Sequence, residues 1–120
     1  MALTFDYEEV DHRVQFIKAS WVSDSNGNAT ATTTKYYDGD LKGLCTIPGD
    51  SDGAPTDDYD ITITDKYGID VLMGAGINRD TANTEYVAYA SLGAVSMSKL
   101  TFAVSATGEL NQGVIAVYII

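Results

Sequence analysis

The sequence predicts an all-β fold, either an antiparallel β-sandwich or a small β-barrel with long loops. Clusters of turn-forming residues recur about every ten residues, as they do in such folds. Between the clusters, apolar and polar residues alternate with the period of two that places one face of a strand against a core, most clearly over residues 59–64. The closing segment, residues 114–120, is apolar on both faces, which indicates a strand that meets water on neither side.

Length and composition indicate a single domain over residues 1–120. A chain of 120 residues, of which 45% are hydrophobic, can bury a core without disulfide or metal staples. Residues 1–12 are a possible N-terminal arm. Residues 48–58 hold both prolines and several aspartates, and they are predicted to form an exposed acidic loop that connects two sheets.

The net charge restricts the classes of partner. The chain has 17 acidic and 7 basic residues, a formal charge of −10, and 13 of the acids are aspartates, which favour turns. Such a surface repels nucleic acids and anionic membranes, so neither is an expected partner. Most of the acids are explained simply by solubility. The N-terminus has no basic and apolar leader pattern and no apolar run is long enough to span a bilayer, which predicts folding in a cytoplasm.

The first half of the chain is expected to contain three strands. Residues 14–22 are rich in strand-forming residues and end at a turn over residues 23–28 that contains Asn-Gly. Residues 29–37 alternate small residues with threonines, which suits an edge strand or a strand lying against another subunit. A break at residues 38–40 precedes a short strand over residues 41–47.

The second half predicts two hairpins. Residues 59–72 place two alternating segments on either side of a polar turn, and residues 100–105 and 114–120 flank a slightly longer loop. Between them, residues 78–98 favour either a helical face or an irregular loop with a short strand at residues 85–90. The last strand is either central between two layers or covered on its outer face by a neighbouring subunit.

Few residues could support catalysis or metal binding. His12 is the sole histidine and is expected at the surface, while Cys45, beside Leu44, is expected to be buried rather than reactive. One histidine and one cysteine exclude a zinc site with several such ligands. Carboxylates of the acidic loop are weak candidates for calcium, although their spacing does not match an EF-hand; these are Asp50, Asp52, Asp57 and Asp58. We predict no catalytic residues and no cofactor.

Aromatic residues are the stronger candidates for a contact surface. The chain has eight tyrosines, and four of them lie in segments that are not obviously core: Tyr36, Tyr37, Tyr86 and Tyr89. Exposed rings bind sugars or proteins, whereas rings at the ends of a thin core would only keep their hydroxyls in water. A carbohydrate-binding module would require Trp21 or paired tyrosines on a flat exposed face.

Two stretches resemble small structural proteins of tailed bacteriophages. They are residues 59–79, which read YDITITDKYGIDVLMGAGINR, and residues 99–105 with the closing residues 113–119. The resemblance covers about the last two thirds of the chain. It implies an all-β virion component, made in the host bacterial cytoplasm, with no catalytic residues to carry over.

This resemblance and the physical pattern together lead to an expected function. We expect a non-enzymatic capsid decoration protein that forms a dimer or trimer and clamps the major capsid protein or another virion protein. A neck or tail ring component is the alternative. The expected interface comprises the four tyrosines above together with Val114, Ile115, Val117 and Ile119 of the last strand.

Overall fold

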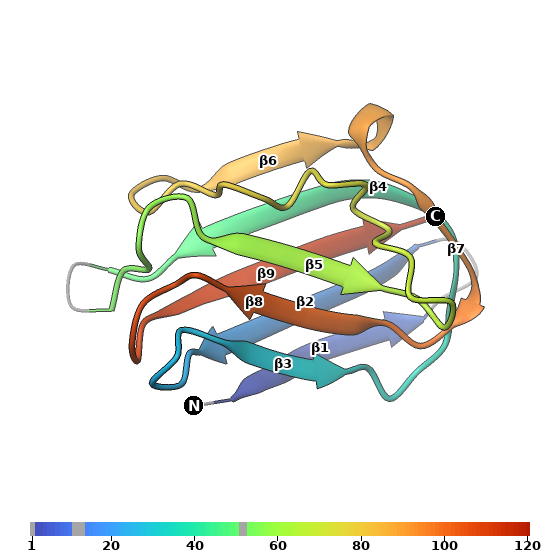
Figure 1. The fold of residues 1–120 in the computed structure, drawn as a ribbon. Coiled ribbons are helices and arrows are strands. Elements are labelled where there is room, and N and C mark those ends of the chain that lie inside the picture. Colours follow the sequence, from blue (N-terminus) through green and yellow to red (C-terminus); the bar gives the residue numbers. More distant parts are fainter. Residues whose placement is uncertain (1, 11–13, 51–52) are drawn as a thin grey trace.

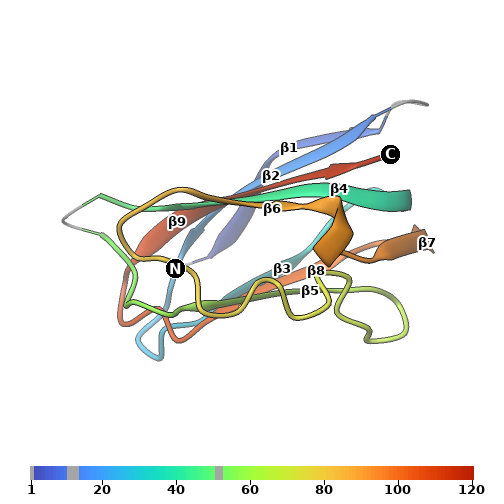
Figure 2. The same ribbon diagram turned by 90° about the horizontal axis from the view of Figure 1, so that it is seen from above.

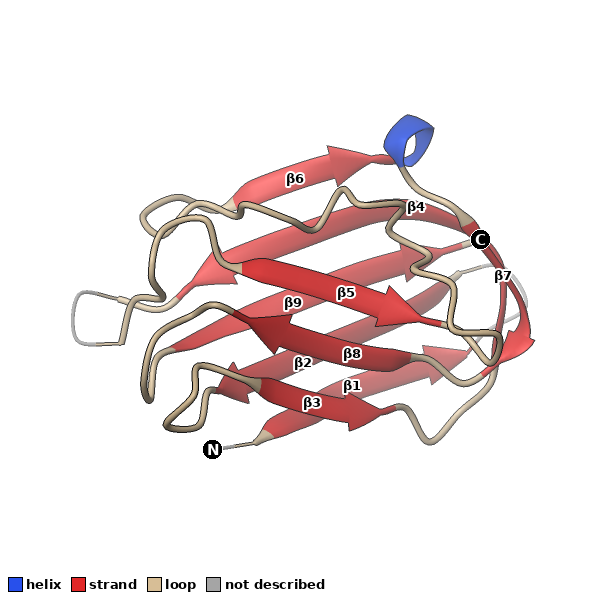
Figure 3. Cartoon of the chain, in the orientation of Figure 1, coloured by secondary structure: helices blue, strands red, loops and turns tan. Residues whose placement is uncertain are grey.

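A computed structural model describes residues 2–10, 14–50 and 53–120 of the protein. These residues form two antiparallel sheets packed face to face (Figure 1), and Figure 3 shows how strands dominate the chain. The larger sheet has six strands, in the order β1 (Leu3–Val10), β2 (Gln15–Val22), β9 (Gln112–Ile119), β4 (Tyr37–Pro48) and β6 (Glu85–Ala88), with β7 (Ala94–Ser98) paired to β4. The smaller sheet has the order β3 (Ala29–Thr32), β8 (Thr101–Ser105), β5 (Asp60–Thr64). The predicted all-β class is confirmed, in its sandwich form.

The core lies between the two sheets, as the view from above shows (Figure 2). Alternate residues of each strand point inward, and the largest buried side chains include Trp21, Phe102 and Ile115. The rings of Phe5 and Phe102 meet edge to face across the two layers, with centroids 5.2 Å apart and planes at 85°. This geometry is favourable for an aromatic pair, and it ties the strand at the edge of one sheet to the central strand of the other.

Strand β9 is central in its sheet, because it pairs with β2 on one side and with β4 on the other. Ile115, Val117 and Ile119 point into the core. The first expected explanation for its apolar character therefore applies only in part: the strand is central, but the second layer covers one of its two faces. Cover of the other face by a neighbouring subunit stays a prediction.

The N-terminal half of the chain differs from the prediction in three places. The predicted arm contains β1, which pairs with β2 through a register shift between Phe5 and Tyr7; residues 1, 11 and 12 lie outside the described residues. The predicted strand over residues 29–37 ends at Thr32. The Thr33 hydroxyl then donates to the carbonyl of Lys35 and accepts from the backbone N–H of Leu100, which holds a turn. The predicted break at residues 38–40 instead lies inside β4 as an irregularity in its pairing.

Neither predicted hairpin forms as a pair of strands. β5 pairs with β8, and the returning segment closes a tight turn on it but forms no strand; it makes a bridge between Thr64 and Asp70, and the N–H of Val71 donates to the carbonyl of Ile63. The Asp70 carboxylate accepts from the backbone N–H groups of Ile63, Leu72 and Gly74, so the chain coils there instead of extending. β8 and β9 lie in different sheets, and residues 106–111 cross between the layers.

The remaining connections are short and irregular. Residues 78–98 were expected to form either a helical face or an irregular loop with a short strand at residues 85–90. The structure has β6 there, which ends at Ala88, followed by one 3-10 turn, η1 (Tyr89–Ser91). The predicted loop over residues 48–58 is present between β4 and β5, where Asp57 and Asp58 are exposed while Gly53 and Pro55 are buried. It connects the two sheets, as expected.

Glu8 of β1 anchors the connection between β3 and β4. Its carboxylate accepts from the backbone N–H and the hydroxyl of Thr34, from the N–H of Lys35, and from the Tyr37 hydroxyl at 3.0 Å. Burial acts to raise the pKa of Glu8, but these hydrogen bonds outweigh it and lower that pKa below its ordinary value. The ionised carboxylate therefore stabilises the crossing between the sheets.

Candidate functional site

The strongest candidate for a functional site is the outer face of the six-stranded sheet, the side turned away from the smaller sheet. No described segment crosses this side (Figure 2). Pairing and alternation place the following residues on it: Thr4, Asp6, Tyr7, Glu9, Phe16, Lys18, Ser20, Val22, Gly43, Cys45, Ile47, Tyr86, Ala88, Gln112, Val114, Ala116 and Tyr118. We call this surface the outer face.

An aromatic row crosses one end of the outer face. The rings of Tyr7 and Phe16 are 5.7 Å apart between centroids, and those of Phe16 and Tyr118 are 4.9 Å apart. Beyond Tyr118, the ring of Tyr86 lies across Gly43, where any larger residue would collide with it. The exposed fractions of Tyr7, Tyr118 and Tyr86 are 49%, 40% and 63%, so the row forms a raised, solvent-facing ridge across the sheet.

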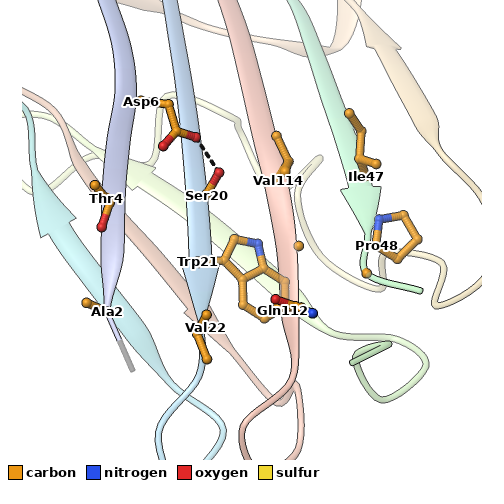
Figure 4. Close-up of a pocket in the computed structure, with 12 residues that line it drawn as sticks. Ala2, Thr4, Asp6, Ser20, Trp21, Val22, Ile47, Pro48, Gln112 and Val114 are labelled. Carbon is orange, nitrogen blue, oxygen red and sulfur yellow. Dashed lines mark hydrogen bonds between the residues drawn. The ribbon is translucent and has the colours of Figure 1, made fainter. Parts of the chain in front are cut away.

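A shallow hollow of about 410 Å³ occupies the other end of the outer face (Figure 4). Side chains from β1, β2, β9 and β4 surround it, including Thr4, Val22, Val114 and Ile47. Among the described residues that line it, Asp6 is the only ionisable one, and the Asp6 carboxylate accepts a hydrogen bond from the Ser20 hydroxyl. The described lining therefore offers a mainly apolar recess without an acid–base pair.

Small residues separate the ridge from the hollow. Ala116 of β9 is directly opposite Cys45 of β4, and Tyr86 of β6 follows on the next strand. Cys45 is half-buried, and burial raises the pKa of its thiol, so the thiol is protonated at neutral pH. The expectation that Cys45 is buried is thus met only in part, since its side chain lies on the outer face rather than in the core.

The outer face carries few charges, unlike the chain as a whole. Its charged residues are two carboxylates, Asp6 and Glu9, and one lysine, Lys18. The formal charge of the whole chain is −10. A weakly charged, aromatic patch on a strongly acidic protein is typical of a surface that contacts another protein.

The outer side of the smaller sheet is different in character. Thr30, Thr32, Thr62, Thr64 and Thr101 face outward on its three strands. The hydroxyls of Thr32 and Thr101 hydrogen-bond to each other at 2.8 Å, and Thr30 donates to the Phe102 carbonyl. Because water solvates hydroxyl groups well, this threonine face needs no partner.

The structure divides the predicted interface residues into two groups. Tyr37, Ile115, Val117 and Ile119 are at most 1% exposed and point into the core, so they cannot contact a second subunit; for these four the prediction was wrong. The reason is that a central strand in a two-layer sandwich turns every second residue inward. Val114 is half-buried on the outer face, while Tyr86, Tyr89 and Tyr36 are exposed.

The residues that the sequence suggested for a sugar-binding platform do not form one. Trp21 is 1% exposed, and its ring packs against Tyr59 and the backbone of Gly113 inside the core. Of the adjacent tyrosines, Tyr36 is exposed beside the ammonium group of Lys99, but Tyr37 is buried. A flat platform built on Trp21 or on the Tyr36–Tyr37 pair is therefore not formed.

The candidate calcium ligands that the structure describes, Asp50, Asp57 and Asp58, do not form a metal site. Among the described residues no three His, Cys, Asp or Glu side chains are arranged to hold a metal ion. The Asp57 carboxylate accepts from the Thr81 N–H, and Asp58 is exposed. Asp52 and His12 lie outside the described part of the chain. No helix within the described ranges has the length and apolar composition to cross a membrane.

Sequence reasoning missed the residues that create the ridge. Tyr7, Phe16 and Tyr118 meet only because β1, β2 and β9 are neighbours, and β9 is about a hundred residues away from β2 in the chain. One feature of the sequence could have indicated this surface. The last strand is apolar on both faces, and in a sandwich of two sheets the second sheet covers only one face of a strand, so the other apolar face is exposed.

Comparisons with known proteins found no matching family model, no matching curated protein and no matching solved structure.

Proposed function

We propose that this protein is a non-enzymatic structural component of a bacteriophage virion, and that it acts as a capsid decoration protein. The observation that carries the proposal is the outer face, a broad, largely apolar surface with few charged residues on a protein whose formal charge is −10. A monomer gains nothing from exposing such a surface, whereas an assembling subunit buries it.

The assembly role is favoured over an enzymatic one by what the hollow offers. Catalysis of the hydrolytic kind needs paired groups with different pKa values in a recess, and Asp6 is the only titratable group among the described residues that line this one. The virion role rests on the resemblance of residues 59–79, 99–105 and 113–119 to phage structural proteins. A ring component of the neck or tail, which would use the same face between subunits, is the second candidate.

Co-sedimentation with undecorated capsids of a tailed bacteriophage tests the proposal. The protein is expected to pellet with the capsids at a fixed ratio to the major capsid protein, and to saturate. Capsids that already carry a full set of decoration subunits are the control and should take up none. Absence of saturable binding to capsids, necks and tails would overturn the virion role.

A further inference from the structure

We infer that the outer face is the site at which a second copy of this chain binds, in a face-to-face dimer with two-fold symmetry. This inference rests on the proposed function as an assembly subunit and names the partner of its surface. Three features of the outer face support it: its charge, its shape and its area.

Charge favours a second copy on this surface. Two copies that approach through their loops bring together aspartates such as Asp24, Asp57 and Asp58, and like charges in close contact are unfavourable. The outer face carries only three charged residues, Asp6, Glu9 and Lys18, and one of the three is positive, so two copies repel each other far less there than through their loops. Among the surfaces of an acidic chain, this one permits self-association.

Shape makes the outer face complementary to itself. The ridge of Phe16, Tyr118 and Tyr86 lies at one end, the hollow beside Val114 lies at the other, and the small residues Cys45 and Ala116 lie between them. Consider a two-fold axis that lies in the plane of the outer face and runs across the strands through Cys45 and Ala116, which are opposite each other on β4 and β9. Rotation about this axis would place the ridge of each copy in the hollow of the other. Such a contact is isologous and closes at two subunits.

The same axis brings two lysines near each other. Lys18 lies in the row of Ala116, so each Lys18 would approach its own counterpart. Asp6 and Glu9 lie on the neighbouring strand β1, and a long lysine side chain can turn its ammonium group toward either carboxylate. The rest of the axis row, Ala116, Cys45 and Tyr86, is uncharged, and there each Tyr86 would also approach its own counterpart.

The area of the outer face is sufficient for a reversible dimer. β9 has 8 residues, which span about 26 Å at ~3.3 Å each, and five strands at ~4.8 Å spacing span about 24 Å. The footprint is therefore about 600 Å² on each copy, or about 1,200 Å² in total, at the lower end for specific interfaces. A dissociation constant in the micromolar range is expected.

The sheet edges are poorer sites for the second copy. β1 is the longer edge strand, but its pairing shifts after Phe5, and a symmetric β1 pair would bring the carboxylates of Asp6, Glu8 and Glu9 from both copies close together. The opposite edge, β6, has only 4 residues. Face-to-face packing of two sheets, as already exists inside the molecule, has neither problem.

Sedimentation equilibrium of the full chain, over a wide range of concentration, tests the inference. The wild-type mass should rise from 12.8 kDa to twice that value as concentration increases. Tyr118→Glu places a charge in the ridge of each copy, and it should raise the dimer dissociation constant at least about 30-fold. Thr62→Glu adds the same charge on the threonine face and should leave the dissociation constant unchanged.

Tyr86→Ser guards against a variant that fails to fold, because Tyr86 is 63% exposed and contributes little to the core. It should also weaken the dimer. A wild-type chain that stays at 12.8 kDa throughout would overturn the inference, as would equal weakening by Tyr118→Glu and Thr62→Glu. A monomer that binds capsids overturns the dimer alone, whereas a dimer that ignores capsids, necks and tails overturns the proposed function alone.

Discussion

The contact between Trp21 and Gly113 provides the most demanding test of the packing inside the sandwich. Gly113 of β9 is paired with Trp21 of β2, and both face the core. A Cβ atom at position 113 would lie 2.6 Å from Cζ2 and 2.9 Å from Cε2 of the Trp21 ring, and 2.9 Å from the carbonyl oxygen of Ile47. Gly113→Ala therefore forces the indole ring or strand β4 to move.

The expected cost follows from these distances. Non-bonded carbon atoms prefer separations of about 3.5–4.0 Å, so the ring must move by about 1 Å in a closely packed core. Overpacking of this kind costs about 1–3 kcal/mol, which lowers the melting temperature by about 4–12 °C in a domain of this size. Urea unfolding monitored by tryptophan fluorescence measures the change in the free energy of unfolding.

A double-mutant cycle with Trp21→Phe identifies the cause. Phenylalanine lacks the second ring that carries Cζ2, so one of the two close contacts is removed. The contact with the Ile47 carbonyl remains, and Gly113→Ala should therefore cost about half as much in the Trp21→Phe background. In the cycle, circular dichroism replaces tryptophan fluorescence as the probe. Gly68→Ala is the control, since no atom lies within 4 Å of its Cβ position and only its positive φ of 76° is unfavourable. A cost for Gly113→Ala below about 0.5 kcal/mol, or an equal cost in both backgrounds, would refute this account of the contact.

Three further predictions concern stability. Phe102→Ala removes a fully buried ring that contacts the opposite sheet and should cost about 3–5 kcal/mol in urea unfolding, whereas Thr62→Ala on the threonine face should cost less than about 0.5 kcal/mol. The pKa of Glu8 is lowered in the folded state, so the stability that its carboxylate contributes is complete above pH 4.5 and is lost as pH falls through the folded pKa. Glu8→Gln should cost about 1–2 kcal/mol at neutral pH, and the free energy of unfolding of this variant should fall less steeply as the solution is acidified. Burial raises the pKa of Tyr59 from 10.0 to about 12, so stability should fall by roughly 3 kcal/mol as pH rises from 10 to 12, and a chain with Tyr59→Phe should lack that component.

The sequence was sufficient to predict strands but not their partners. Alternation over residues 61–63 and 102–104 marks which side chains enter the core, and the structure buries Ile61, Ile63, Phe102 and Val104. Alternation does not distinguish a hairpin from a connection between sheets, because residues 106–111 are long enough for either. The predicted hairpin at residues 59–72 keeps its turn, but the returning segment coils where the Asp70 carboxylate accepts from three backbone N–H groups.

The candidate site was predicted less well than the fold, for a related physical reason. Tyr86 and Val114 were among the predicted interface residues and lie on the outer face, but the ridge also requires Tyr7 and Phe16. Their contact depends on the strand order β1-β2-β9, which follows from long-range pairing rather than from local pattern. Which of two apolar faces in β9 is covered likewise depends on where the smaller sheet packs.

The accessibility of Cys45 tests the central claim, that the outer face is buried between subunits, most directly. Cys45 is half-buried in the middle of this face and is the only cysteine of the chain, so an alkylating reagent reports on one position. At fixed pH, the alkylation rate should fall as protein concentration rises and should stay constant for Tyr118→Glu. A rate that does not change with concentration, while the mass shows a dimer, would place the contact on another surface and contradict the account.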